Sequence, residues 1–148
     1  MKIMTKNKLI RFLKCFLFVS VVIFASTFLQ FYWSMGQFSE RMSSSCMECW
    51  FVEDAFYMSI LTGVFLAIIF NSLVFIKNKF VQIGIQFLFL ISIWYFWDYT
   101  IFVERESSWS TYLFNEEIYY VTSLSVLPIL VLSLATVFFI NYKSFINR

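Results

Sequence analysis

The sequence contains no histidine, so it lacks the side chain that most often acts as a general base, a proton shuttle or a metal ligand. Its glycines, Gly36, Gly63 and Gly84, are too far apart to form a phosphate-binding loop. No serine has an evident base partner for nucleophilic catalysis. We therefore predict that the protein is not an enzyme, and we expect no cofactor and no metal site.

Charged residues are also scarce: they make up 14% of the chain, against 61% apolar and 23% aromatic residues. This balance lies outside the range of soluble proteins and indicates an integral membrane protein. A membrane β-barrel needs short segments of alternating polarity, whereas the apolar runs here are long and continuous, each with roughly the 20 residues that cross a hydrocarbon core. We predict an all-α membrane protein with one domain, residues 1–148, and four transmembrane helices at about residues 15–35, 55–76, 80–99 and 118–142.

The basic residues are unevenly distributed among the connecting segments. Nine of the 11 Lys and Arg residues precede the first span, follow the fourth, or lie in the turn at residues 77–79. The other two, Arg41 and Arg105, lie in the connections that also hold the acidic residues. The positive-inside rule then places both termini in the cytoplasm. All tryptophans fall on the outer side, where we expect an aromatic belt at the headgroup level. They are Trp33, Trp50, Trp94, Trp97 and Trp109.

No charged residue is expected within the spans proper. Asp98, in the stretch Trp97-Asp98-Tyr99, comes nearest and is placed at the outer boundary. Ion pumps and proton-coupled carriers need buried ionisable groups, so transport by this chain alone is not expected. Nucleic-acid binding is not expected either, because topology and contact with anionic lipid account for the basic residues of the N-terminus.

The second span carries a helix-packing face of small residues at intervals of four, which lets helices approach closely in lipid. The face consists of Ser59, Gly63, Ala67 and Asn71. Because the turn at residues 77–79 is short, we expect spans two and three to form an antiparallel hairpin. Asn71 and Gln86 lie at similar distances from that turn, about 8 to 10 Å into the core, and are expected to meet across the hairpin. A polar substrate path is the alternative interpretation.

The single proline, Pro128, falls inside the fourth span, where it removes a backbone hydrogen bond and is expected to kink the helix. Thr122 and Ser125 are expected to help satisfy the carbonyl groups that it frees. A gating hinge is the alternative interpretation.

Two of the cysteines, Cys46 and Cys49, stand at C-x-x-C spacing in the first outer loop. In a bacterial inner membrane this loop faces the oxidising periplasm, where a disulfide persists. We therefore predict a local disulfide that stiffens the entry to span two. A metal site would need Glu48 or Glu53 as a further ligand, because two thiolates without histidine leave a tetrahedral ion incomplete. Cys15, on the cytoplasmic side, is expected to be a buried small apolar residue.

Four spans with a C-x-x-C pair in the first outer loop resemble the quinone-reducing membrane partner of the periplasmic disulfide oxidases. The resemblance rests on the topology and on Cys46 and Cys49. That family relays electrons through a second cysteine pair in the second outer loop, whereas residues 98–117 contain no cysteine. A membrane thiol-disulfide oxidoreductase is therefore the alternative function.

The second outer loop mixes charges, hydroxyl groups and aromatic rings, the kinds of side chain that anchor a protein partner. The candidate contact residues are Glu104, Arg105, Glu106, Trp109 and Tyr112. The alternative is a solvated loop in which Trp109 dips into the membrane interface and Asn115 caps the fourth span.

In outline, a small four-span protein with both ends inside resembles the bacterial immunity proteins that block pore-forming toxins in the inner membrane. The resemblance is one of topology over the whole chain. It implies a non-enzymatic protein of the bacterial inner membrane that acts by contact with a membrane or periplasmic protein, in an immunity or regulatory role. A subunit of a transporter is the third interpretation.

Overall fold

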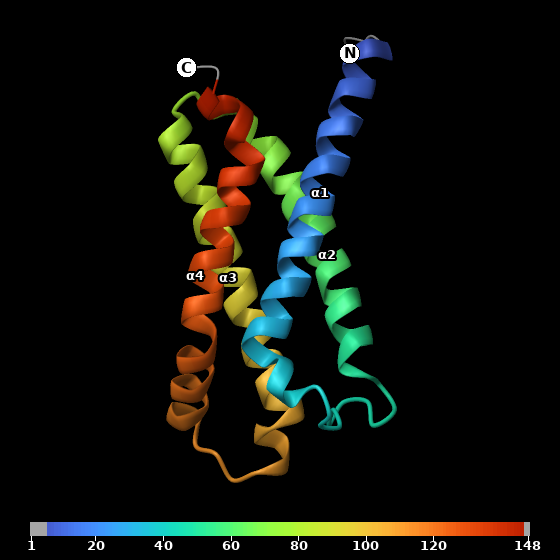
Figure 1. Ribbon diagram of the computed structural model, residues 1–148, viewed down its shortest axis with the longest axis vertical. Helices are drawn as coiled ribbons and strands as arrows, with labels where there is room; N and C mark the ends of the chain where they lie inside the picture. Colours follow the sequence, from blue (N-terminus) through green and yellow to red (C-terminus); the bar gives the residue numbers. More distant parts are fainter. Residues whose placement is uncertain (1–5, 147–148) are drawn as a thin grey trace.

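The computed structural model describes residues 6–146, which form four long helices (Figure 1). The helices are α1 (Lys6–Met35), α2 (Phe51–Ser72), α3 (Lys79–Arg105) and α4 (Phe114–Ile146). Short 3-10 helices follow the first three of them: η1 (Gly36–Phe38), η2 (Leu73–Phe75) and η3 (Ser107–Trp109). Residues 6–146 contain no β-strand, and the all-α prediction is confirmed.

All four helices are long and apolar enough to cross a membrane. All four extend beyond the predicted spans at ends where charged residues interrupt the apolar runs. Glu53 and Asp54 lie in the first turn of α2, and Glu116 and Glu117 lie in the first turn of α4. Acidic side chains are favourable there because they interact with the positive end of the helix dipole. These charged residues therefore belong to the first turn of each helix and do not lie outside it. Asn115 lies inside α4 and is not its cap.

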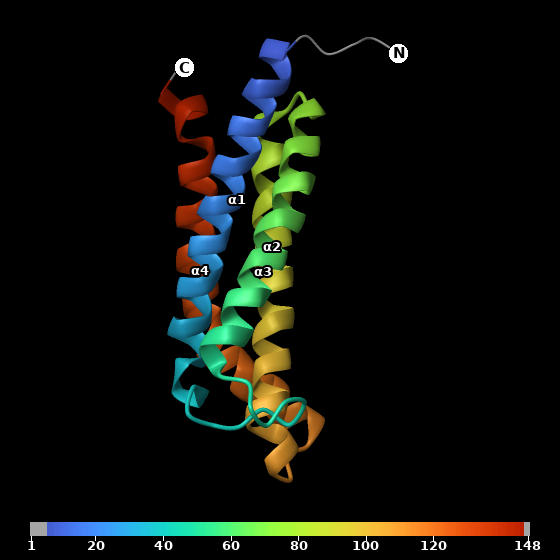
Figure 2. The ribbon, with the colours of Figure 1, turned by 90° about the vertical axis from the view of Figure 1, so that its right-hand side faces the viewer.

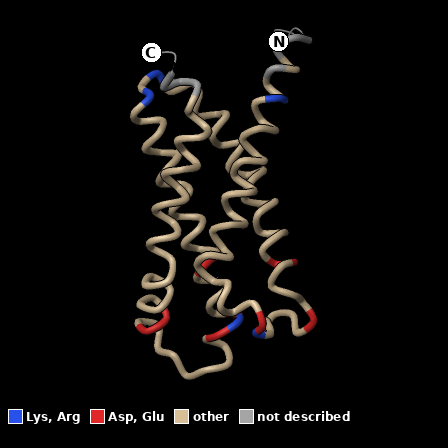
Figure 3. The backbone as a smooth tube through the Cα atoms, in the orientation of Figure 1, with Lys and Arg blue, Asp and Glu red and all other residues tan. Residues whose placement is uncertain are grey.

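The helices run alternately up and down (Figures 1 and 2). The start of α1, the end of α4 and the α2–α3 turn (residues 73–79) lie together at what we call the terminal end. The α1–α2 and α3–α4 connections (residues 36–50 and 106–113) lie at the opposite, loop end. The acidic residues gather in the half of the bundle nearer the loop end (Figure 3). α1 packs mainly against α2 and α4, and α3 against α4, whereas α2 and α3 contact one another sparsely.

The small residues of α2 lie on a buried face, and Gly63 packs against α1. Ser59, Gly63 and Ala67 are buried. A Cβ atom built on Gly63 would lie 3.0 Å from the carbonyl oxygen of Ser20 and 3.3 Å from the Cβ of Phe24, both on α1. The missing side chain at Gly63 is therefore what allows the two helices to approach so closely.

No hydrogen bond joins Asn71 to Gln86 in the described structure, although both residues line the same cavity. Asn71 donates instead to the carbonyl oxygen of Ala67 in its own helix, at 2.7 Å. Gln86 accepts a hydrogen bond of 2.8 Å from the side chain of Asn141 on α4. The reason is helix pairing, since α2 packs on α1 and α3 packs on α4. A short turn brings two helix ends together without determining which faces of the helices meet.

Two apolar clusters fill the bundle, and polar bonds lie among them. One cluster includes Ile23, Leu66, Leu90, Trp94 and Ile129, and the one nearer the loop end includes Phe31, Met35, Phe51, Phe102 and Val121. Trp94 is fully buried and donates through Nε1 to Thr27 Oγ1 at 2.9 Å. It belongs to the core, which corrects its assignment to the aromatic belt.

Pro128 lies within α4, which continues as one helix on both sides of it. The nearby hydroxyl groups do not bond the carbonyls that the proline frees. Thr122 shares a hydrogen bond of 3.0 Å with the Tyr95 hydroxyl of α3, and the buried Ser125 hydroxyl faces the Asp98 carboxylate of α3 without a well-formed hydrogen bond. Thr122 thus joins α4 to α3 and does not bond the carbonyl groups that Pro128 frees.

Candidate functional site

The two connections at the loop end are joined into a single unit, which we call the loop cap (residues 36–54 and 104–117). The backbone nitrogen of Ser44 donates to the carbonyl oxygen of Glu104 at 2.9 Å. The Trp109 indole nitrogen donates to the carbonyl oxygen of Met42 at 3.1 Å. The Ser43 hydroxyl donates to a carboxylate oxygen of Glu104 at 3.3 Å. The α1–α2 connection is therefore bound to the end of α3 and the start of the second connection.

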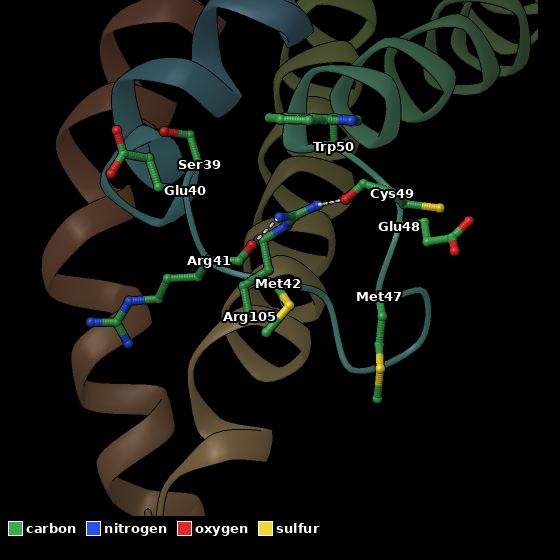
Figure 4. Close-up of a pocket in the computed structure, with 9 residues that line it drawn as sticks. All are labelled: Ser39, Glu40, Arg41, Met42, Met47, Glu48, Cys49, Trp50 and Arg105. Atoms are coloured by element: carbon green, nitrogen blue, oxygen red, sulfur yellow. Dashed lines mark hydrogen bonds between the residues drawn. The ribbon is translucent and has the colours of Figure 1, made fainter.

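Arg105 lies at the centre of the loop cap, with 2% of its surface exposed. Its Nη1 atom donates to the carbonyl oxygen of Arg41 at 2.5 Å, and its Nη2 atom donates to Asp54 Oδ2 at 2.5 Å and to the carbonyl oxygen of Cys49 at 3.3 Å. The guanidinium also lies over the Phe51 ring, 5.4 Å from its centroid. One side chain from α3 thus fixes both ends of the α1–α2 loop, as Figure 4 shows for its bonds to Arg41 and Cys49, and through Asp54 it also fixes the first turn of α2.

Glu106 is buried and pairs with Arg41 from the other connection. It also accepts a hydrogen bond of 3.3 Å from the Tyr112 hydroxyl. The Tyr112 ring packs against Phe102 and Tyr120, with ring centroids 5.6 and 5.3 Å away. This second cluster ties the α3–α4 connection to α4.

The predicted partner-contact residues separate into two groups in the structure. Arg105 and Glu106 are buried and bonded inside the cap, so they hold it together instead of facing a partner, which corrects the expectation for these two. Glu104 and Tyr112 are partly buried in the same bonds. Trp109 is exposed, with 52% of its surface accessible. Charge alone could not distinguish these cases, because a guanidinium can serve either as an internal brace or as an external contact.

Cys46 and Cys49 form a disulfide, with their Cα atoms 5.3 Å apart, in agreement with the predicted pairing. Because the Cys49 carbonyl also accepts from Arg105, the disulfide loop is attached to the centre of the cap. Cys15, the remaining cysteine, is exposed on α1, which corrects the expectation that it is buried. Among the described residues no group of three or more His, Cys, Asp or Glu side chains could hold a metal ion.

A cavity of about 390 Å³ lies in the cap beside Arg105 (Figure 4). Large apolar side chains, Met42, Met47 and Trp50, line it, and all three are exposed. Trp50 has 73% of its surface accessible. The cap therefore has an interior of internally bonded charged groups and an outer surface rich in methionine and tryptophan.

A polar site inside the bundle was not anticipated. Asp98 of α3 is fully buried, and its carboxylate accepts a hydrogen bond of 2.7 Å from Gln30 and one of 2.9 Å from Ser34, both on α1. Asp98 lies within the stretch Lys79–Trp109, which is long and apolar enough to cross a membrane, about two turns before the end of α3. A carboxylate removed from water is costly unless hydrogen-bond donors compensate, and these two residues supply them.

The sequence does hold a signal for this site. Gln30 and Ser34 stand four residues apart in an otherwise apolar run, which places both on one face of α1. Asp98 forms no ion pair within the described part of the chain. An ionisable residue with buried polar partners inside a membrane-spanning segment is a candidate functional site.

No protein family matches the chain, and neither do any curated proteins or solved structures. The resemblances to immunity proteins and to the membrane partner of disulfide oxidases therefore rest on topology and on the cysteine pair alone.

Proposed function

We propose that this chain is a non-enzymatic integral membrane protein that acts by contact with another protein through its loop cap. Four helices long and apolar enough to span a membrane support the first part of the proposal. The loop cap supports the second part.

The observation that carries the proposal is the contrast between the interior and the exterior of the cap. Arg105 fixes the loop from inside, while Met47, Trp50 and Trp109 remain exposed. Tryptophan and methionine are enriched in protein interfaces, and tryptophan is common among the residues that dominate binding energy. A surface whose backbone is already fixed loses less conformational entropy when it binds a partner.

We place the protein in a bacterial inner membrane, with both termini in the cytoplasm and the loop cap in the periplasm. The Lys and Arg distribution supports this orientation. Reporter fusions after residues 38, 78 and 110 test it, with expected positions outside, inside and outside. A cytoplasmic signal after residue 38 or 110 would overturn the orientation and, with it, a periplasmic partner.

An immunity protein against a pore-forming toxin is the concrete form of the proposal, and a regulatory or accessory subunit is its more general form. In either case the partner is a membrane or periplasmic protein that approaches the outer leaflet. A transporter subunit is the form that Asp98 favours, because a buried carboxylate inside a span is the kind of group that transport pathways use.

The thiol-disulfide oxidoreductase is less well supported. Cys46 and Cys49 lie at the loop end, whereas Cys15 lies in the part of α1 near the terminal end. No second thiol pair is present to pass electrons to Cys46 and Cys49. The disulfide therefore serves as a staple in the cap.

Site-specific photocross-linking in the organism that encodes the chain tests the contact function. A photoreactive phenylalanine analogue replaces Trp50 or Trp109 in the cap, and replaces Trp33 on α1 as the matched control. Trp33 and Trp109 are each 52% exposed, so they differ in location and not in accessibility. We expect a discrete protein adduct from Trp50 and Trp109 and none from Trp33. Adducts at all three positions alike, or at none, would contradict the proposal.

A further inference from the structure

A second cavity, of about 690 Å³, lies among all four helices near the terminal end, far from the loop cap. Its volume falls within the range of small-molecule binding sites in proteins. α1 contributes Lys14 and Phe18 to the lining, and α3 contributes Lys79 and Gln86. Asn141 of α4 lies on the same cavity.

The lining combines apolar, amide and cationic side chains. Phe18, Phe70 and Phe139 supply aromatic walls. Gln82, Gln86 and Asn141 are buried amides, and Asn141 donates to Gln86 at 2.8 Å. Lys14 and Lys79 supply positive charge. An amphiphilic molecule, with a polar part and a chain, would match both kinds of surface.

The positive charge of the cavity has no acidic counterpart. Lys79 donates only to the neutral side chain of Gln82, at 3.3 Å, and neither lysine forms an ion pair within residues 6–146. All acidic residues of the chain lie between positions 40 and 117, in the half of the bundle toward the loop end. The site is therefore suited to an anion.

We propose that this cavity binds an anionic phospholipid. The phosphate would pair with Lys14 and Lys79, the buried amides would bond the polar oxygens next to it, and an acyl chain would lie against Phe18 and Phe139. Basic pockets between transmembrane helices recognise anionic headgroups in this way. A zwitterionic lipid should bind less well because the cation of its headgroup repels the lysines. Inorganic phosphate should bind less well because it has no acyl chain to contact the aromatic walls.

Cys15 provides an internal reporter for this site. It lines the cavity, is exposed, and is the one cysteine outside the disulfide. A lipid bound between Lys14 and Lys79 would therefore shield its thiol. The experiment measures the rate of maleimide labelling of the purified full-length protein in a non-ionic detergent, by intact mass. Phosphatidylglycerol, phosphatidylcholine with the same chains, and inorganic phosphate are added in separate titrations.

We expect phosphatidylglycerol to slow the labelling of Cys15, and phosphatidylcholine and inorganic phosphate to leave it unchanged. Equal protection by both lipids would show a non-selective apolar groove and overturn the proposal. Protection by inorganic phosphate at the same concentration as phosphatidylglycerol would show a site for a soluble anion and would also overturn it. No protection by any of the three would do the same.

The double variant Lys14→Gln, Lys79→Gln tests the role of the two cations. Each lysine near a lipid phosphate contributes about a factor of five in affinity, so protection should need about 30-fold more phosphatidylglycerol. Lys77→Gln is the matched control, because Lys77 lies in the turn and does not line the cavity. Each variant is compared with its own lipid-free labelling rate, after circular dichroism has shown an unchanged helix content. An equal loss in the Lys77→Gln variant would show that net charge alone attracts the lipid, and the site would be rejected.

Discussion

The Nε2 atom of Gln30 donates a hydrogen bond of 2.7 Å to the Oδ2 atom of Asp98, and neither residue has any exposed surface. The two residues lie on α1 and α3, which contact each other much less than α1 contacts α2. The bond is therefore a principal link between these two helices. It also supplies one of the donors that make the burial of the carboxylate tolerable.

Removing one partner of this bond should cost more than removing both. Gln30→Leu leaves the Asp98 carboxylate buried with one donor fewer, and we expect a loss of about 1–3 kcal/mol in the free energy of unfolding. The double variant Gln30→Leu, Asp98→Leu removes the buried charge as well, so it should be more stable than the sum of the two single variants predicts. Reversible unfolding in mixed micelles measures the coupling.

Gln37→Leu serves as the control, since Gln37 is exposed in η1 and should tolerate the change. Strictly additive effects of Gln30→Leu and Asp98→Leu would mean that the two side chains do not stabilise each other.

Gly63 and Gly84 allow a matched test of helix packing. Gly63→Ala places a methyl group 3.0 Å from the Ser20 carbonyl oxygen, so α1 must shift, and we expect a loss of about 1–3 kcal/mol. A methyl group on Gly84 meets no atom within 4 Å, and alanine is the better helix former by about 1 kcal/mol. Gly84→Ala should therefore be neutral or stabilising. Thermal unfolding measures the change in stability of each variant. An equal change at the two positions would contradict the packing of α2 on α1.

The number and kind of helices could be read from the sequence because a run of apolar residues long enough to cross a membrane has few other stable structures. The pairing of Cys46 with Cys49 was predictable for a similar reason, since two cysteines three positions apart are brought together by local backbone alone. In both cases the information lies within one short segment.

The contacts between helices were not predictable in the same way. Asn71 and Gln86 are equidistant from a turn, but the rotation of each helix about its axis decides what they face. For α2 that rotation depends on Gly63 packing against α1, and on α3 the Gln86 side chain bonds Asn141 of α4. Arg105 and Asp98 were misjudged because a charged residue near a helix end has the same local sequence signature whether it faces water or the bundle. These placements depend on partners far away in the chain.

The geometry of Arg105 should matter more than its charge. A lysine at this position keeps one positive charge but cannot reach the carbonyl groups of Arg41 and Cys49 and the Asp54 carboxylate together. We expect Arg105→Lys to loosen the loop cap and to increase the rate of protease cleavage within residues 39–50 about tenfold, as the loss of one or more hydrogen bonds to a charged group implies.

Arg41→Lys is the comparison, because the Arg41 side chain is half exposed and its pair with Glu106 is worth at most about 1 kcal/mol. Its backbone carbonyl remains available to Arg105 in that variant. Similar cleavage rates in the two variants would show that Arg105 does not organise the cap.

The disulfide between Cys46 and Cys49 should act as a staple with a modest effect. Because it closes a very short loop, its removal should cost at most about 2 kcal/mol. We expect the double variant Cys46→Ala, Cys49→Ala to insert normally and to keep the cross-link from Trp50, since Arg105 still holds the loop through the Cys49 carbonyl position. If this double variant loses the cross-link from position 50 while the Trp109→Ala variant keeps it, the cysteine pair itself is needed for function.

The redox state of the pair separates the staple from the oxidoreductase. A staple stays oxidised, so a membrane-impermeant maleimide should label neither Cys46 nor Cys49 in intact cells until a reductant is added. A catalytic pair cycles between thiol and disulfide, so part of it would be labelled without reductant, and that part would grow when quinone is depleted. The sequence holds no second cysteine pair that could pass electrons to Cys46 and Cys49. We therefore expect no labelling without reductant, whether or not quinone is depleted. Labelling that depends on quinone would require an external thiol donor and would replace the contact function with electron transfer.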